Sequence, residues 1–194
     1  MVIREVFSTI KDFDQASANL ASVLGVTRDQ MSSLTDQAKE LGATTRFTAS
    51  EVSELQLEFA KLGFTQEQIL GMTDSVLDLA GATGSELGES ASIVGATMRG
   101  FGLEVEETRR VTDVMSKSFS SSSLDMSKFS TSMASVAPVA KLAGYSIEET
   151  TALIGTLTDR GIDASTAGTG LRNMFLRANK AGLTFEQALK QIKN

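Results

Sequence analysis

The nine residues from Ala60 to Gln68, AKLGFTQEQ, hold the pattern that decides the fold. An apolar residue, Gly63 and a second apolar residue are followed by Thr65, two further residues and Gln68. Glycine directly after a helix takes the left-handed conformation without a Cβ clash, so Gly63 predicts a helix end. Threonine with glutamine three residues later is the capping box that begins a helix. The stretch therefore predicts a tight joint between two helices, in which the apolar residue between them can pack on the next first turn.

The same pattern recurs along the chain at nearly equal spacing. Its glycines are Gly25, Gly63, Gly102, Gly144 and Gly182, separated by 38, 39, 42 and 38 residues. The capping pairs after them are Thr27/Gln30, Thr65/Gln68, Glu104/Glu107, Ser146/Glu149 and Thr184/Gln187, of which the third is the weakest. A period of about 40 residues predicts a tandem array of helical hairpins.

A looser series lies between these joints and predicts the turn inside each hairpin. It comprises Gly42 with Thr48 and Glu51, Gly81 with Thr83 and Glu86, the four serines Ser120–Ser123, and Gly161 with Asp163. Two joints in each period predict helices of roughly 15–18 residues, about ten in all.

Apolar residues recur at helical spacing between the joints. The stripes are Val52, Leu55, Phe59 and Leu62; Leu87, Ala91, Val94, Met98 and Phe101; Met126, Phe129, Met133, Val136 and Ala140; and Ala164, Ala167, Leu171, Met174, Phe175 and Ala178. Pro138 is expected to kink or divide the helix of the third stripe. No window alternates with a period of two, so the predicted fold is all-α: helical hairpins packed as a bundle or a short α-solenoid.

The composition excludes most enzyme chemistry. The 194 residues include no His, no Cys and no Trp, which removes Ser-His-Asp and Cys-His catalysis and the usual zinc, haem and iron–sulfur ligands. The net charge of −6 is unlike that of nucleic-acid binders, which carry a basic patch. Neither a signal peptide nor an 18-residue apolar span is present, so no membrane span is expected.

Three pairs of carboxylates could in principle serve acid–base chemistry, as in glycosidases. They are Glu51/Glu54, Glu106/Glu107 and Glu148/Glu149. Each pair falls in the first turn of an expected helix, where acidic residues complement the helix dipole, and this structural role is favoured. Ser8 and Lys11 match Ser-x-x-Lys without its companion motifs, and Gly168-Thr169-Gly170 lacks the third glycine of a dinucleotide loop. We therefore expect no catalytic, cofactor-binding or metal-binding residue.

Several short sequence segments at these joints match the sequence pattern of a known family. They span residues 38–42, 47–52, 60–65, 79–84, 143–150 and 161–172. The last, GIDASTAGTGLR, is the most specific, because a generic helical hairpin does not require its run of small residues. With these phrases, residues 41–194 resemble the conserved core region of phage tail tape measure proteins, whereas the first forty residues fit loosely.

This resemblance implies a structural role in a virion tail, assembled in the cytoplasm of the bacterial host. Members of the family are long helical chains that occupy the tail tube lumen, set tail length and leave ahead of the DNA on infection. The implied partners are the tail tube protein, tail assembly chaperones and baseplate or tail-tip proteins, with self-association within the tail. Lytic modules of the family lie in other domains, so the resemblance implies no enzyme activity in this segment. The composition and charge predict no cofactor and no sequence-specific nucleic-acid binding.

The predicted organisation is an N-terminal helical lead-in over residues 1–42 and a helical-hairpin core over 43–194. The last unit has one short helix without its partner, so we expect the protein to continue beyond Asn194. The frequent helix breaks predict a folded domain carried by the ruler rather than the ruling stretch. Two other readings remain open: a non-viral α-helical repeat module that binds proteins, and a carboxylate-based glycan hydrolase.

Overall fold

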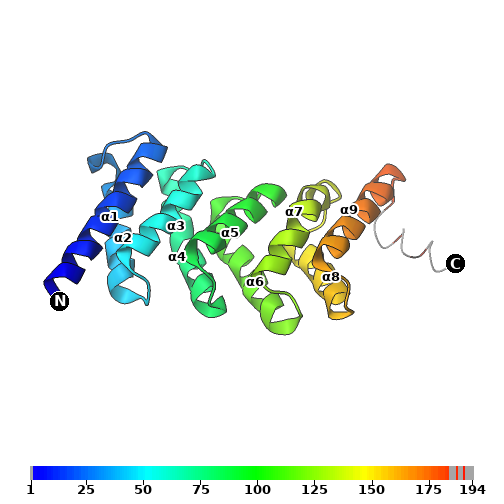
Figure 1. The fold of residues 1–194 in the computed structure, drawn as a ribbon. Helices are drawn as coiled ribbons and strands as arrows, with labels where there is room; N and C mark the ends of the chain where they lie inside the picture. Colours follow the sequence, from blue (N-terminus) through cyan, green and yellow to red (C-terminus); the bar gives the residue numbers. More distant parts are fainter. Residues whose placement is uncertain (1, 184–186, 188–189, 191–194) are drawn as a thin grey trace. The chain divides into compact units, whose positions relative to one another are not determined.

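The computed structural model describes the backbone of residues 2–183, 187 and 190, and the side chains of those from residue 11 onward. This part of the chain forms nine α-helices and two 3-10 turns and contains no strand (Figure 1). The elements are α1 (Val2–Leu24), η1 (Asp29–Met31), α2 (Ser32–Thr44), α3 (Ala49–Lys61), α4 (Gln66–Thr83), α5 (Leu87–Phe101), η2 (Val105–Glu107), α6 (Thr108–Ser121), α7 (Met126–Leu142), α8 (Ile147–Asp159) and α9 (Ala164–Lys180). The all-α prediction is confirmed. The predicted capping residue Thr184 lies outside the described residues.

The contacts divide the chain into two compact units. The first comprises residues 1–95 with 105–109, and the second comprises 96–104 with 110–194. In the first unit α3 packs against α1, α2 and α4, and in the second α9 packs along α7 while α8 contacts both. The division into a lead-in of residues 1–42 and a core of 43–194 remains a prediction; Gly42 itself lies inside α2.

All five glycines of the repeated joint end a helix in the left-handed conformation, with φ between +61° and +81°. At Gly63, the amide of Gly63 donates to the carbonyl of Ala60 at 2.8 Å, and that of Phe64 donates to the carbonyl of Phe59 at 3.1 Å. These are the two bonds of a Schellman motif, which satisfies carbonyls that the helix end leaves free. The same pair of bonds recurs at each of the other four joints and at Gly161.

The apolar residue after the glycine packs back onto the helix that has just ended. The rings of Phe59 and Phe64 meet edge to face with centroids 5.8 Å apart, which is the hydrophobic contact that often accompanies a Schellman motif. At the equivalent position Tyr145 stacks on Phe175 of α9, with centroids 4.3 Å apart. The apolar residue after the glycine therefore packs either on the preceding helix or on a neighbouring one.

Capping boxes open three helices, at Thr48, Thr65 and Ser146, as predicted. Thr27 and Gln30 exchange the same bonds, but a 3-10 turn follows them and α2 begins only at Ser32. The weakest of the five repeated joints, with Glu104 and Glu107, likewise leads into a 3-10 turn, η2, before α6 begins at Thr108. Asp163 caps α9 by accepting from the amides of Ser165 and Thr166.

In two of the predicted hairpin turns the glycine does not end its helix. Gly42 and Gly81 lie inside α2 and α4, because each helix continues past its glycine, to Thr44 and Thr83. The left-handed residue that ends α4 is Gly84, with φ +72°. Thr83 is the last residue of α4, where its hydroxyl donates to the carbonyl of Leu79 at 2.8 Å, so it does not cap the next helix. Glycine permits a helix end but does not impose one.

The four apolar stripes form nearly half of the core, and buried residues of α1, α2, α4, α6 and α8 contribute most of the remainder. Every residue of the stripes on α5 and α7 is buried, and Phe59, Phe129 and Phe175 are fully buried. Leu62 and Met174, which end or border their stripes, are half-buried. α7 is one continuous helix through Pro138, so Pro138 does not divide it, and a kink there remains a prediction.

Small residues let α7 and α9 approach closely. A Cβ added to Gly168 of α9 would lie 2.5 Å from the carbonyl oxygen of Ser132 and 2.8 Å from its Cα. Gly95 has a similar role, because a Cβ added to Gly95 would lie 2.5 Å from the Cδ1 of Leu62. Gly170 and Gly81, in contrast, face open space. Some interior glycines therefore serve close packing and others do not.

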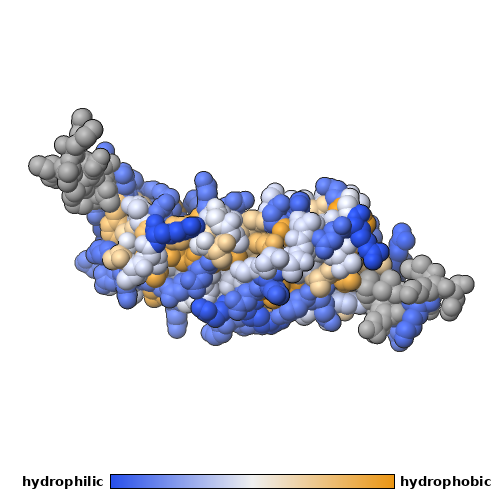
Figure 2. All heavy atoms as spheres, turned by 90° about the horizontal axis from the view of Figure 1, so that it is seen from below, coloured by the Kyte–Doolittle hydropathy of each residue, from blue (hydrophilic) through white to orange (hydrophobic). Residues whose placement is uncertain are grey.

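The surface shows no single large apolar area on the face seen in Figure 2, where hydrophobic residues appear at several places between hydrophilic ones. Among the described residues, the exposed large hydrophobic side chains are Val23, Leu142, Ile162 and Leu176, each on a different element or turn. Exposed apolar residues scattered singly are ordinary on protein surfaces.

Candidate functional site

Two of the candidate carboxylates are used by helix caps. Glu51 accepts hydrogen bonds from the amide of Thr48 at 2.7 Å and from its hydroxyl at 2.9 Å. Glu149 accepts equivalent bonds from Ser146, at 2.9 Å and 3.0 Å. These bonds satisfy backbone donors at the helix start, which is the structural role that the sequence favoured.

Glu148 forms a two-point ion pair with Arg110. Its two carboxylate oxygens accept from Nε at 2.6 Å and from a terminal guanidinium nitrogen at 2.9 Å. The hydrogen bond from Arg110 is the largest cause that lowers the pKa of Glu148 from 4.5 to about 2. A general acid needs a pKa near the working pH, so this carboxyl stays ionised and is unsuited to donate a proton at neutral pH.

The remaining candidates do not come together as one site. Glu106 and Glu107 lie in η2, and Glu54 lies on α3, where it is exposed. Gly168, Thr169 and Gly170 lie inside α9 rather than in a loop, with Gly168 against α7. Lys11 lies on α1, and the side chain of Ser8 lies outside the described residues.

Adjacent arginines at the start of α6 make ion pairs within different units. Arg109 reaches Asp78 of α4 at 3.3 Å in the first unit, and Arg110 reaches Glu148 of α8 in the second. Arginine in the first turn of a helix opposes the helix dipole. These two side chains are therefore placed by their partners on the neighbouring hairpins, 31 residues before and 38 residues after.

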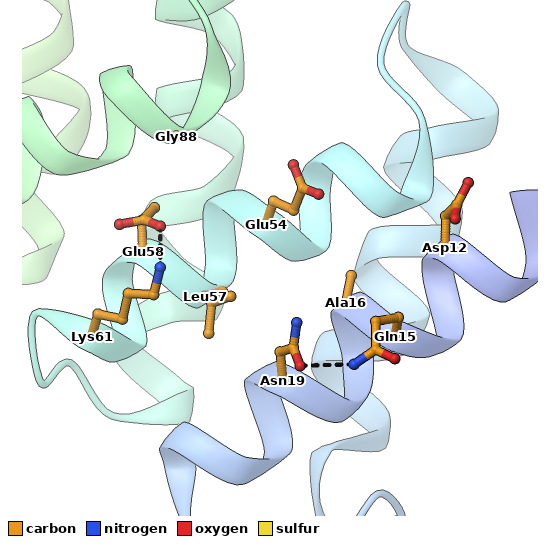
Figure 3. Close-up of a pocket in the computed structure, with 9 residues that line it drawn as sticks. All are labelled: Asp12, Gln15, Ala16, Asn19, Glu54, Leu57, Glu58, Lys61 and Gly88. Carbon is orange, nitrogen blue, oxygen red and sulfur yellow. Dashed lines mark hydrogen bonds and ion pairs between the residues drawn. The ribbon is translucent and has the colours of Figure 1, made fainter.

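A groove with an acidic lining crosses the first unit. It encloses about 430 Å³ between α1, α3 and the start of α5 (Figure 3). Its residues are Asp12, Gln15, Ala16 and Asn19 of α1, Glu54, Leu57, Glu58 and Lys61 of α3, and Gly88 of α5. Both helices contribute positions i, i+3, i+4 and i+7, which is one face of a helix.

Polar contacts organise the two walls of the groove. Gln15 donates to Asn19 at 3.0 Å along α1, and Lys61 pairs with Glu58 at 2.6 Å along α3. Leu57 and Ala16 lie between the two sets of polar residues, as Figure 3 shows. Gly88 leaves the third side open, since an added Cβ there would only touch the Cγ of Glu58, at 3.7 Å.

Sequence reasoning missed this groove. The helical spacing of the lining residues within α1 and within α3 is visible in the sequence. Which face of α1 lies opposite which face of α3 cannot be predicted from that spacing. The acidic character had a signal: residues 1–95 contain fourteen Asp and Glu against six Lys and Arg.

Among the described residues, no three acidic side chains are positioned to hold a metal ion. No helix in the same part of the chain has the length and apolarity needed to cross a membrane.

Comparison with known proteins adds evidence independent of the geometry. The family of phage-related minor tail proteins matches residues 35–193. The tape measure protein of Pneumococcus phage Dp-1 is 32% identical over 181 residues, and the probable tape measure protein of Escherichia phage P2 is 33% identical over 183 residues. Each alignment covers 93% of this chain but only 16% and 22% of the respective relative.

The likeness to tape measure proteins is thus confirmed and is broader than the quoted phrases suggested. Because 93% of the chain is aligned, it extends into the first forty residues, which the phrases matched loosely. The family match alone covers well over half of the chain. The chain therefore belongs to the family of phage-related minor tail proteins.

Proposed function

We propose that the chain is a segment of a phage or prophage tail tape measure protein, which occupies the tail tube lumen, sets tail length and leaves ahead of the DNA. The observation that carries this proposal is the alignment of nearly the whole chain with two proteins named as tape measure proteins. The same family match favours a phage tail role over a non-viral repeat module.

Within such a ruler, this segment serves as a folded domain rather than as an extended spacer. The longest described helix, α1, has 23 residues and would measure about 35 Å at 1.5 Å per residue. One straight helix of 194 residues would measure about 290 Å. Left-handed glycines end the helices and capping boxes begin new ones, so this segment contributes far less to tail length than one unbroken helix would.

The segment acts without catalysis. The carboxylates of Glu51 and Glu149 are occupied by helix caps, and that of Glu148 by an arginine that lowers its pKa to about 2. With no His or Cys in the sequence, the common nucleophile–base pairs are missing as well. This supports a structural role over the glycan hydrolase reading.

The proposed location is the virion tail, and the proposed partners are the tail tube protein, tail assembly chaperones, baseplate or tail-tip proteins and further copies of the chain. The surface supports protein contacts rather than direct nucleic-acid binding. Phosphate backbones are bound by clustered cations, and the chain as a whole carries a net charge of −6.

Tail length measured by electron microscopy tests the proposal. A second copy of residues 35–193 is inserted after the first in the full-length protein of the phage that encodes this chain. As one straight helix the insert would add about 240 Å, whereas a folded domain adds much less. The matched control inserts an equally long stretch taken from a continuous helical region of the same protein, and its tails lengthen by about 240 Å.

Mass spectrometry of the purified tails accompanies the length measurement. Peptides from this segment are expected in wild-type tails, and their absence there would contradict the tail role itself. Lengthening by the full helical amount with the duplicated segment would contradict only the folded-domain part of the proposal.

A further inference from the structure

The two parts of the sequence differ in charge. Residues 1–95 hold fourteen acidic and six basic residues, whereas residues 96–194 hold ten acidic and twelve basic residues. The basic residues of the second part include three on α9, which contains no acidic residue between Ala164 and Lys180. Opposite charge at separate places on one chain provides the complementarity that a contact between two copies requires.

The outer face of α9 is basic and has an apolar centre. Arg172, Leu176 and Lys180 follow each other at intervals of four residues, so they form one stripe about 12 Å long. All three are exposed, and Leu176 keeps 39% of its surface accessible. Neither Arg172 nor Lys180 forms an ion pair with another residue in the part of the chain that the structure describes.

The groove of the first unit has matching features. Asp12 on one wall and Glu54 and Glu58 on the other supply three carboxylates against the single cation Lys61. Leu57 and Ala16 provide apolar surface between the walls. Glu54 is exposed and makes no ion pair among the described residues, so its charge remains available.

We propose that α9 of one copy docks in this groove of a second copy. Arg172 and Lys180 then face the carboxylates of the two walls, while Leu176 lies against Leu57. Positions 54–61, which form one wall of the groove, span about 10 Å of helix, close to the length of about 12 Å of the basic stripe on α9. The proposal deepens the self-association proposed above by naming the two surfaces that meet.

Sedimentation velocity of the 194-residue chain at low and high ionic strength tests this contact. Wild type is expected to associate with rising concentration at low salt and to become monomeric at high salt, because exposed charges are screened. Glu54→Lys and Arg172→Glu each raise the dissociation constant by about tenfold or more, because each places like charges opposite each other. The double variant Glu54→Lys/Arg172→Glu restores association.

A matched control separates the contact from net charge. Glu40→Lys changes the charge as Glu54→Lys does, at an exposed position of α2 outside the groove, and is expected to associate as wild type does. Far-UV circular dichroism verifies that each variant is folded. A wild type that stays monomeric at low salt overturns the proposal. Equal weakening by Glu40→Lys and Glu54→Lys, or a double variant that stays monomeric, overturns it too. None of these outcomes bears on whether the chain is found in tails.

Discussion

Gly168→Ala is expected to weaken the fold although alanine is the better helix former. Gly168 is buried where α9 crosses α7, and an added Cβ would lie 2.5 Å, 2.8 Å and 3.0 Å from the carbonyl oxygen, Cα and carbonyl carbon of Ser132. These are backbone atoms of a continuous helix, so no side chain can turn away to make room. To restore an ordinary contact of 3.4 Å, the helices must separate by about 0.9 Å.

The magnitude follows from two opposing effects. Overpacking costs about 1–3 kcal/mol, and the rigid backbone of α7 places this case near the upper limit. Replacing a helical glycine by alanine returns about 1 kcal/mol. The expected net loss is about 2 kcal/mol in the free energy of unfolding, which lowers the melting temperature by roughly 4–8 °C for a chain of this size.

Urea unfolding followed by far-UV circular dichroism measures this loss, and Gly170→Ala is the matched control. Gly170 lies two residues further along α9, is exposed and has nothing within 4 Å of an added Cβ. Its substitution carries the same gain of about 1 kcal/mol without the clash, so it is expected to stabilise the protein. If Gly168→Ala proves as stable as Gly170→Ala, the close crossing of α7 and α9 does not exist as described.

Three further predictions use the same unfolding assay. Thr65→Ala removes the capping box of α4 and should cost about 1 kcal/mol, whereas Thr83→Ala should change stability by less than about 0.5 kcal/mol because Thr83 caps no helix; equal losses would argue against this assignment. Gly63→Ala should cost about 1 kcal/mol because φ is +81°, while Gly81→Ala, inside α4 with open space around it, should stabilise by about as much; a loss at Gly81 would indicate a helix end there. Glu148→Gln should cost no more than about 1 kcal/mol at pH 7, because the side chains of Arg110 and Glu148 are 45% and 44% exposed. The pKa of Glu148 is lowered to about 2, so its contribution is complete above pH 4.5 and is lost as the pH falls toward 2; an unchanged difference between wild type and variant across that range would contradict the ion pair.

The repeated joints were predictable because their cause is local. A Schellman motif and a capping box use only residues within a few positions of each other, so the pattern around Gly63 contains all the partners it needs. The two glycines of the looser series show the limit of this local reasoning, because a glycine permits a helix end without imposing one. Gly42 lacks the compact pattern, whereas Gly81 has it, with Thr83 and Glu86 spaced as Thr65 and Gln68 are; even so, the left-handed residue that ends α4 is Gly84, three positions later.

The contacts between hairpins were not predictable from one sequence. Arg110 and Glu148 are 38 residues apart, which is one period, but the sequence does not state which of the nearby acidic residues Arg110 reaches. The groove depends in the same way on which faces of α1 and α3 lie opposite each other. Such pairings depend on how the helices pack against each other, and one amphipathic helix face can pack about equally well against many others.

The stretch GIDASTAGTGLR carried the most specific part of the family resemblance, and its packing explains why. Ala164, Ala167, Gly168 and Leu171 form the buried face of α9, so the small residues are required where two helix backbones nearly touch. Asp163 caps the helix, and Gly161 ends the one before it. Nothing in the structure explains the exposed Gly170. The stretch is therefore specific because it encodes a close helix crossing between two fixed ends, and likeness in this stretch is evidence of shared fold rather than of a shared ligand.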